Sequence, residues 1–197
     1  TGNGVTTMVP YGVPASGLFV VGLQNGGMRQ WTGQGFKQLQ DGGWKSAVGA
    51  MMPYRGGVVV GLADGAVEFW DGTGFRQLKD TGWKAGVTAI APWNDKLGDG
   101  FIVGLSNGSV QRWTGFEWAE LASSGWSSAV TNIIAYNDTE LDPNGNLTET
   151  PVGVIVGLAD GAVELWRPSP NFNRSGYWTQ LQGTGWANSV NVLFSVD

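Results

Sequence analysis

The chain has 197 residues, a net charge of −5 and neither cysteine nor histidine, so disulfides, thiolate chemistry and histidine bases are excluded. Only 11 Lys and Arg residues, with no basic run, argue against nucleic-acid binding, and no apolar run is long enough for a membrane helix. The composition, 14% charged and 12% aromatic, argues against disorder, and 33 dispersed glycines indicate many turns.

An apolar segment rich in β-branched residues opens each of several repeats. Because it is apolar on both faces, it is typical of a buried strand. Its copies are residues 5–11, 48–54, 87–93, 130–136 and, more loosely, 190–196.

A second strand follows and leads into a short turn. We expect this strand at residues 18–23, 58–62, 101–105 and 154–158. Every copy then carries Asn-Gly or Asp-Gly, which favours a type I′ hairpin. The turn residues are Asn25-Gly26, Asp64-Gly65, Asn107-Gly108 and Asp160-Gly161.

The third strand alternates and ends in tryptophan, at Trp31, Trp70, Trp113 and Trp166. Its polar positions, Arg29, Glu68, Gln111 and Glu164, are expected to be solvated. A fourth strand then begins with an aromatic residue, at Phe36, Phe75, Trp118 and Trp178. It ends before a Gly-Trp pair, whose tryptophans are Trp44, Trp83, Trp126 and Trp186.

Four strands repeating about every 40 residues predict an all-β propeller of four-stranded antiparallel blades, with about four repeats per chain. The order from residue 75 to residue 113 resembles that of WD-repeat proteins, although Trp-Asp survives only at Trp70-Asp71 and no Gly-His pair is present. The Trp-rich repeats are also similar to those of propeller lectins.

We predict one domain over residues 1–197, made of four repeats and an extra C-terminal strand. The resemblance implies that residues 58–93 join two strands of one blade to two of the next, and that residues 178–181 close a ring with the N-terminal strands. The ring is either small, part of a longer array, or completed by a second chain. Two polar insertions, at residues 137–151 and 167–177, predict surface loops.

The strongest candidate binding residues combine two repeated features that the repeat places at one end of each blade. They are the Gly-Trp tryptophans Trp44, Trp83, Trp126 and Trp186 and the turn residues Asn25, Asp64, Asn107 and Asp160. Sugars are bound by such aromatic rings and polar acceptors, although the tryptophans can equally be packing residues. An alternative surface at the opposite end comprises Tyr11, Tyr54, Trp93 and Tyr136.

Catalysis is not expected. The acidic pairs Asp64/Glu68 and Asp160/Glu164 could serve glycoside hydrolysis, but they are better explained as turn and strand residues that vary between repeats. We expect no catalytic residues, no metal and no cofactor.

The sequence therefore favours a non-catalytic, multivalent carbohydrate-binding or adhesion module. A protein interaction scaffold is the alternative, and a glycosidase is a distant third. The expected partners are a glycan or a protein surface, without nucleic acid or membrane insertion, and with a possible homo-oligomer. We expect an extracellular or cell-surface location, although no signal peptide is visible and the start at Thr1 suggests a processed chain.

Overall fold

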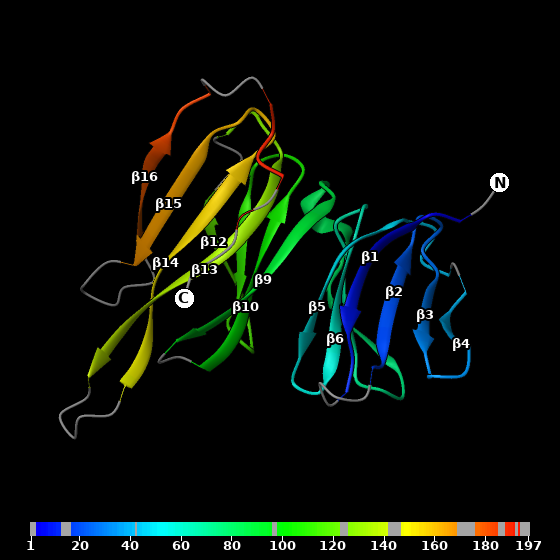
Figure 1. The fold of residues 1–197 in the computed structure, drawn as a ribbon. Coiled ribbons are helices and arrows are strands. Elements are labelled where there is room, and N and C mark those ends of the chain that lie inside the picture. The colour runs from blue at the N-terminus through cyan, green and yellow to red at the C-terminus, as the bar shows by residue number, and fades with distance from the viewer. Residues whose placement is uncertain are drawn as a thin grey trace. The chain divides into compact units, whose positions relative to one another are not determined.

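The computed structural model describes residues 3–12, 17–41, 43–95, 98–122, 126–141, 147–168, 176–184, 188–191 and 193. These residues form four antiparallel sheets of four strands each, in which spatial order follows chain order (Figure 1). The all-β fold class is thereby confirmed. The described chain adds one short 3-10 helix, η2 (Thr81–Trp83).

Each sheet is one repeat. Repeat 1 comprises β1 (Val5–Pro10), β2 (Phe19–Leu23), β3 (Met28–Trp31) and β4 (Phe36–Gln40). Repeat 2 comprises β5 (Val48–Tyr54), β6 (Gly57–Leu62), β7 (Val67–Trp70) and β8 (Phe75–Lys79). Repeat 3 comprises β9 (Val87–Asp95), β10 (Gly98–Leu105), β11 (Val110–Trp113) and β12 (Trp118–Ala122). Repeat 4 comprises β13 (Val130–Leu141), β14 (Leu147–Leu158), β15 (Val163–Pro168) and β16 (Gly176–Gln182).

This pairing corrects the expected phase of the blades. The fourth strand of each repeat pairs with the third strand just before it, as β8 does with β7 and β16 with β15. Residues 58–93 therefore contain three strands of one sheet and the first strand of the next. Residues 178–181 lie within β16, so the expected closure through that strand is wrong.

The hairpin turns also differ from the expected type. In repeat 1 the amide of Gly26 donates to the carbonyl of Leu23 (3.1 Å), and Gly26 has φ 81°. Asn25 is not among the described residues with positive φ, so the turn is type I followed by a left-handed glycine rather than type I′. The same hydrogen bond recurs at Gly65, Gly108 and Gly161. Asn-Gly or Asp-Gly therefore occupies the third and fourth positions of each turn, whereas a type I′ turn would place it at the second and third.

The first insertion is not an irregular loop. Strands β13 and β14 continue through it as a long hairpin, whose last pair is Leu141 with Leu147. In the second insertion, residues 169–175 lie outside the described residues, and its flanks extend β15 and β16 to the pair Pro168 and Gly176.

The chain divides into two compact units, Thr1–Ile90 and Ala91–Asp197. Repeats 1 and 2 make up most of the first unit, and their sheets enclose one apolar core. Repeat 1 contributes Val9, Val20 and Met28, and repeat 2 contributes residues that include Val60 and Trp70. Whether the whole chain acts as one domain stays a prediction.

The expected extra strand at residues 190–196 is only partly described. No β-ladder includes Val190, Asn191 or Leu193, and residues 192 and 194–197 lie outside the described residues. No helix in the described part of the chain is long and apolar enough to cross a membrane.

Candidate functional site: the junctions between repeats

The structure brings together the two features that the sequence singled out, the Asx-Gly turn and the Gly-Trp loop. In repeat 1 a Cβ added at Gly26 would lie 2.5 Å from the carbonyl oxygen of Ser46, two residues after Trp44. In repeat 2 the corresponding distance, from Gly65 to the Ala85 oxygen, is 2.6 Å. Gly108 approaches the Trp126 oxygen in the same way in repeat 3. Only glycine allows this backbone contact, so turn and loop form one junction in each of repeats 1, 2 and 3.

Hydrogen bonds tie the same loops to the next repeat. The amide of Ala63 donates to the carbonyl of Ala47 (2.8 Å), and that of Ala159 donates to Ala129 (2.9 Å). Asp160 donates its amide to the hydroxyl of Ser128 (2.9 Å). The junctions at Trp44 and Trp126 therefore each combine a loop with turns from two successive repeats.

Each Asn or Asp that was predicted to bind a ligand already forms a hydrogen bond within its own turn. Its Oδ1 accepts a hydrogen bond from the amide two residues later, at 3.0–3.1 Å in all four copies. These bonds satisfy the turn, as Asx turns do. The second polar atom of each side chain takes no part in the turn. Asn25, Asn107 and Asp160 are exposed, and Asp64 is half-buried.

Two of the Gly-Trp tryptophans, Trp44 and Trp126, pack against the next repeat while staying partly exposed. Trp44 makes a T-shaped contact with Phe75 (ring centroids 4.9 Å apart), and Trp126 makes the equivalent contact with Trp178 (4.5 Å). The ammonium of Lys79 lies 5.5 Å from the ring centroid of Trp83. Trp44, Trp83 and Trp126 are all half-buried, and Trp186 lies outside the described residues.

The alternative surface is largely used for packing. Tyr11 lies on Trp70 of the next repeat, with centroids 4.7 Å apart, and Trp93 packs on Trp166 at 5.8 Å. Trp93 is only 2% exposed, so its ring is not available at the surface. Tyr54 contacts Phe69 within its own repeat, and Tyr136 is 43% exposed.

The polar position of the third strand was expected to be solvated, but it is buried in repeats 2, 3 and 4. Glu68 accepts a hydrogen bond from Gln77 (3.3 Å), and Glu164 accepts one from Gln180 (3.0 Å). Burial raises the pKa of Glu68, partly offset by Gln77. Among the described residues no group of three potential metal-ligating side chains is found.

Sequence reasoning missed a role for the glycine within the second strand. A Cβ at Gly22 would lie 2.5 Å from Cγ1 of Val48, the first residue of the next repeat. The same glycine-to-valine contact recurs in each repeat, where Gly61 meets Val87, Gly104 meets Val130 and Gly157 meets Val190. The signal was the repeated Gly-Leu before each turn, which marks a close approach of two strands.

No protein-family model matches the chain, and no curated protein matches it significantly. Solved structures do. The crystal structure of the computationally designed Ika4 protein aligns with a TM-score of 0.60 and 22% identity, over 86% of this chain and 94% of that one. The computationally designed Ika8 protein aligns with a TM-score of 0.54 and 20% identity, over 97% of this chain and 66% of that one. At this identity the likeness shows the fold alone, a propeller-like arrangement of four-stranded sheets.

Proposed function

We propose that this protein is a non-catalytic, multivalent binding module that binds carbohydrate at the junctions between its repeats. One observation carries the proposal. In the junctions of Trp44, Trp83 and Trp126, a partly exposed tryptophan ring belongs to the loop that packs on an Asx turn. An aromatic face for sugar C–H groups and polar atoms for hydroxyls are the two elements of a sugar site.

The junctions need not be equivalent. In repeat 2 the ammonium of Lys79 covers part of the Trp83 ring and pairs with Asp80 (3.1 Å). We therefore expect weak sites of unequal affinity, which gain strength by binding a multivalent glycan together. The Trp-rich repeat pattern of the sequence resembles that of propeller lectins, and on this resemblance we also propose an extracellular or cell-surface location.

A glycan array with the labelled chain tests the proposal directly. Trp83→Ala removes a ring, and we expect about tenfold weaker binding at that junction, which corresponds to ~1.4 kcal/mol. Asp64→Asn keeps the Oδ1 acceptor that the turn needs, as Asn25 and Asn107 show, and changes only the second polar atom.

Phe116→Ala is the matched control, because this ring is 86% exposed and lies outside the junctions. It should leave binding unchanged. An array with no bound glycan, from a chain whose circular dichroism shows an intact fold, would refute the proposal. A large loss of stability in Trp83→Ala would instead identify that ring as a packing residue.

A protein interaction scaffold is the second candidate, favoured by the exposed outer strand of repeat 4. Tyr177 and Leu181 are each 52% exposed on β16, which is an edge strand of its sheet. Apolar side chains on an edge suit a protein partner. Saturable binding to a defined protein that Leu181→Lys abolishes, in a chain that binds no glycan, would favour this candidate.

A further inference from the structure

Successive repeats within a unit meet through the same three contacts, which we call a seam. The back face of the earlier repeat offers the second-strand glycine, the Gly-Trp tryptophan and the aromatic near the end of the first strand. The front face of the later repeat offers the first-strand valine, the aromatic that opens the fourth strand and the third-strand tryptophan. In the first unit the pairs are Gly22 with Val48, Trp44 with Phe75 and Tyr11 with Trp70.

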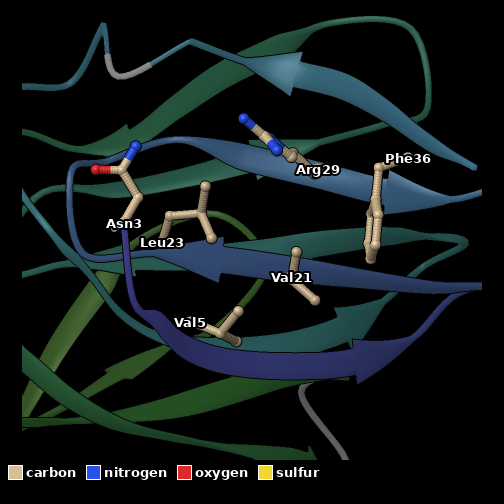
Figure 2. Close-up of a pocket in the computed structure, with 6 residues that line it drawn as sticks. All are labelled: Asn3, Val5, Val21, Leu23, Arg29 and Phe36. Carbon is tan, nitrogen blue, oxygen red and sulfur yellow. The ribbon is translucent and has the colours of Figure 1, made fainter. Parts of the chain in front are cut away.

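The front face of repeat 1 has the same residues but is open. Val5 and Met8 are each 62% exposed, whereas their counterparts Val48 and Met51 are buried. Phe36, the counterpart of Phe75, is 54% exposed. This sheet carries a hollow of about 280 Å³. Figure 2 shows the side chains that line it: Asn3, Val5, Val21, Leu23, Arg29 and Phe36.

The back face of repeat 4 is also incompletely covered. Tyr136 is exposed, whereas its counterparts Tyr11 and Trp93 pack on a following repeat. Ile155 is half-buried, whereas Ile102, at the same position of repeat 3, is fully buried.

The remaining position of that back face is held by the C-terminal segment. Val190 and Leu193 pack on Gly157 as the first strand of a following repeat would. The backbone amide of Val190 donates to the carbonyl of Leu158 (3.1 Å), and the Thr131 hydroxyl donates to the carbonyl of Val190. The side-chain amide of Asn132 donates to the carbonyl of Asn191 (3.3 Å). Val190, Asn191 and Leu193 belong to no β-ladder. By contrast, β1, the equivalent segment of repeat 1, is paired with β2 through five residue pairs.

We propose that the protein self-associates head to tail, the front face of repeat 1 docking on the back face of repeat 4 of a second copy. Val5 and Met8 of one copy replace Val190 and Leu193 on Gly157 of the other, and Trp31 receives Tyr136. The interface continues the seam that each unit already contains, so both surfaces are complementary by repetition. A head-to-tail contact of this kind closes into a ring or grows into a chain.

Sedimentation over a range of concentrations tests this, because a single chain has a mass of 20.9 kDa. Met8→Arg blocks the front face. Gly157→Val blocks the back face, since a Cβ there would lie 2.6 Å from Cγ1 of Val190 and would meet the replacing Val5 in the same way. Each variant alone should sediment as a monomer, with association at least tenfold weaker than in the wild type. Phe116→Arg, an exposed position away from both faces, should associate normally.

Mixing the two blocked variants separates association between copies from closure of one chain on itself. Each variant retains one intact face, so the mixture should form a dimer of doubled mass. A mixture that stays monomeric, or a wild-type chain that is monomeric at millimolar concentration, overturns the proposal. Should Met8→Arg fail to fold by circular dichroism, Phe36→Arg takes its place.

The double variant Val190→Ser and Leu193→Ser tests which segment packs on Gly157, the C-terminal segment of the same copy or the first strand of the other copy. It weakens the hold of the C-terminal segment, so it should strengthen association severalfold. Loss of association in this variant would mean that the segment itself bridges the copies, which contradicts the proposed exchange.

Discussion

The two units of the chain contain the same seam in nearly the same detail. Trp44 on Phe75 and Tyr11 on Trp70 in the first unit correspond to Trp126 on Trp178 and Trp93 on Trp166 in the second. The units differ in how their last glycine is covered. Val87, which begins β9, covers Gly61, whereas Val190, outside any ladder, covers Gly157. The position of a residue within its repeat therefore determines whether it belongs to a seam. Whether that residue is buried depends on the segment that packs on it.

The third-strand tryptophans give the largest test of this comparison. Trp70 and Trp166 are buried in equivalent seams, so Trp70→Ala and Trp166→Ala should each lower the free energy of unfolding by about 3–5 kcal/mol. Trp31, at the equivalent position of repeat 1, is only half-buried, so Trp31→Ala should cost less than half as much. Urea unfolding measures all three. Equal losses would show that the cost comes from within each sheet and not from the seam.

The methionines of the first strand offer a matched pair within one unit. Met51→Ala removes a buried side chain and should cost about 2–4 kcal/mol. Met8→Ala removes an exposed one and should change stability by less than about 0.5 kcal/mol, when measured in dilute solution where copies are dissociated. Thermal unfolding followed by circular dichroism compares them. A comparable loss at Met8 would mean that the front face of repeat 1 is covered.

The second-strand glycines test the difference between the two ways of covering a seam. A Cβ at Gly104 would lie 2.8 Å from Cβ of Val130 and 3.0 Å from Cδ1 of Ile133, both near the start of β13. Gly104→Val should therefore cost about 1–3 kcal/mol by overpacking. The atoms nearest to a Cβ at Gly157 belong to Val190 and Leu193, which no ladder holds in place. We expect these residues to move away in Gly157→Val, so its cost should stay below about 1 kcal/mol. A larger loss at Gly157 than at Gly104 would contradict this assignment.

Most of the strand positions could be predicted from the sequence, because apolar runs, Asx-Gly and Gly-Trp punctuate every repeat. Val48–Tyr54 was predicted to the residue. The growth of β13 and β14 into the insertion was not, since polar residues rich in Asn and Pro resemble a loop whether or not they pair. The turn type was also missed, because Asn-Gly serves both a type I′ turn and a type I turn with a left-handed glycine.

Burial was the part that the sequence could not supply. Alternation shows which side chains share a face of a strand, but it does not show whether another sheet covers that face. Glu68 and Arg29 stand at the same repeat position, and only Glu68 is buried. Likewise, Trp44 and Trp126, which are proposed to bind a ligand, are half-buried against the next repeat, a contact that alternation along the sequence does not show.

The buried glutamate gives the smallest expected effect and the one with a defined pH dependence. Burial raises the pKa of Glu68 above 4.5, its ordinary value in the unfolded chain. Between pH 4.5 and the raised pKa, the folded chain therefore binds more protons than the unfolded chain. Stability is therefore lost as the pH rises through that window, and the loss is complete above the raised pKa. Glu68→Gln removes it, so the variant should be more stable than the wild type at pH 7, by less than about 1 kcal/mol, and should lose this gain in acid.

Repeat 3 shows why a glutamine should fit at position 68. There Gln111 is the buried member and donates to the carboxylate of exposed Glu120 (3.3 Å), the reverse of Glu68 and exposed Gln77. The double variant Glu68→Gln and Gln77→Glu reproduces that arrangement, and it should keep both the hydrogen bond and the gain in stability. Urea unfolding at several pH values compares the three proteins. Parallel stability profiles for wild type and Glu68→Gln would show that the carboxylate is well solvated in the folded chain.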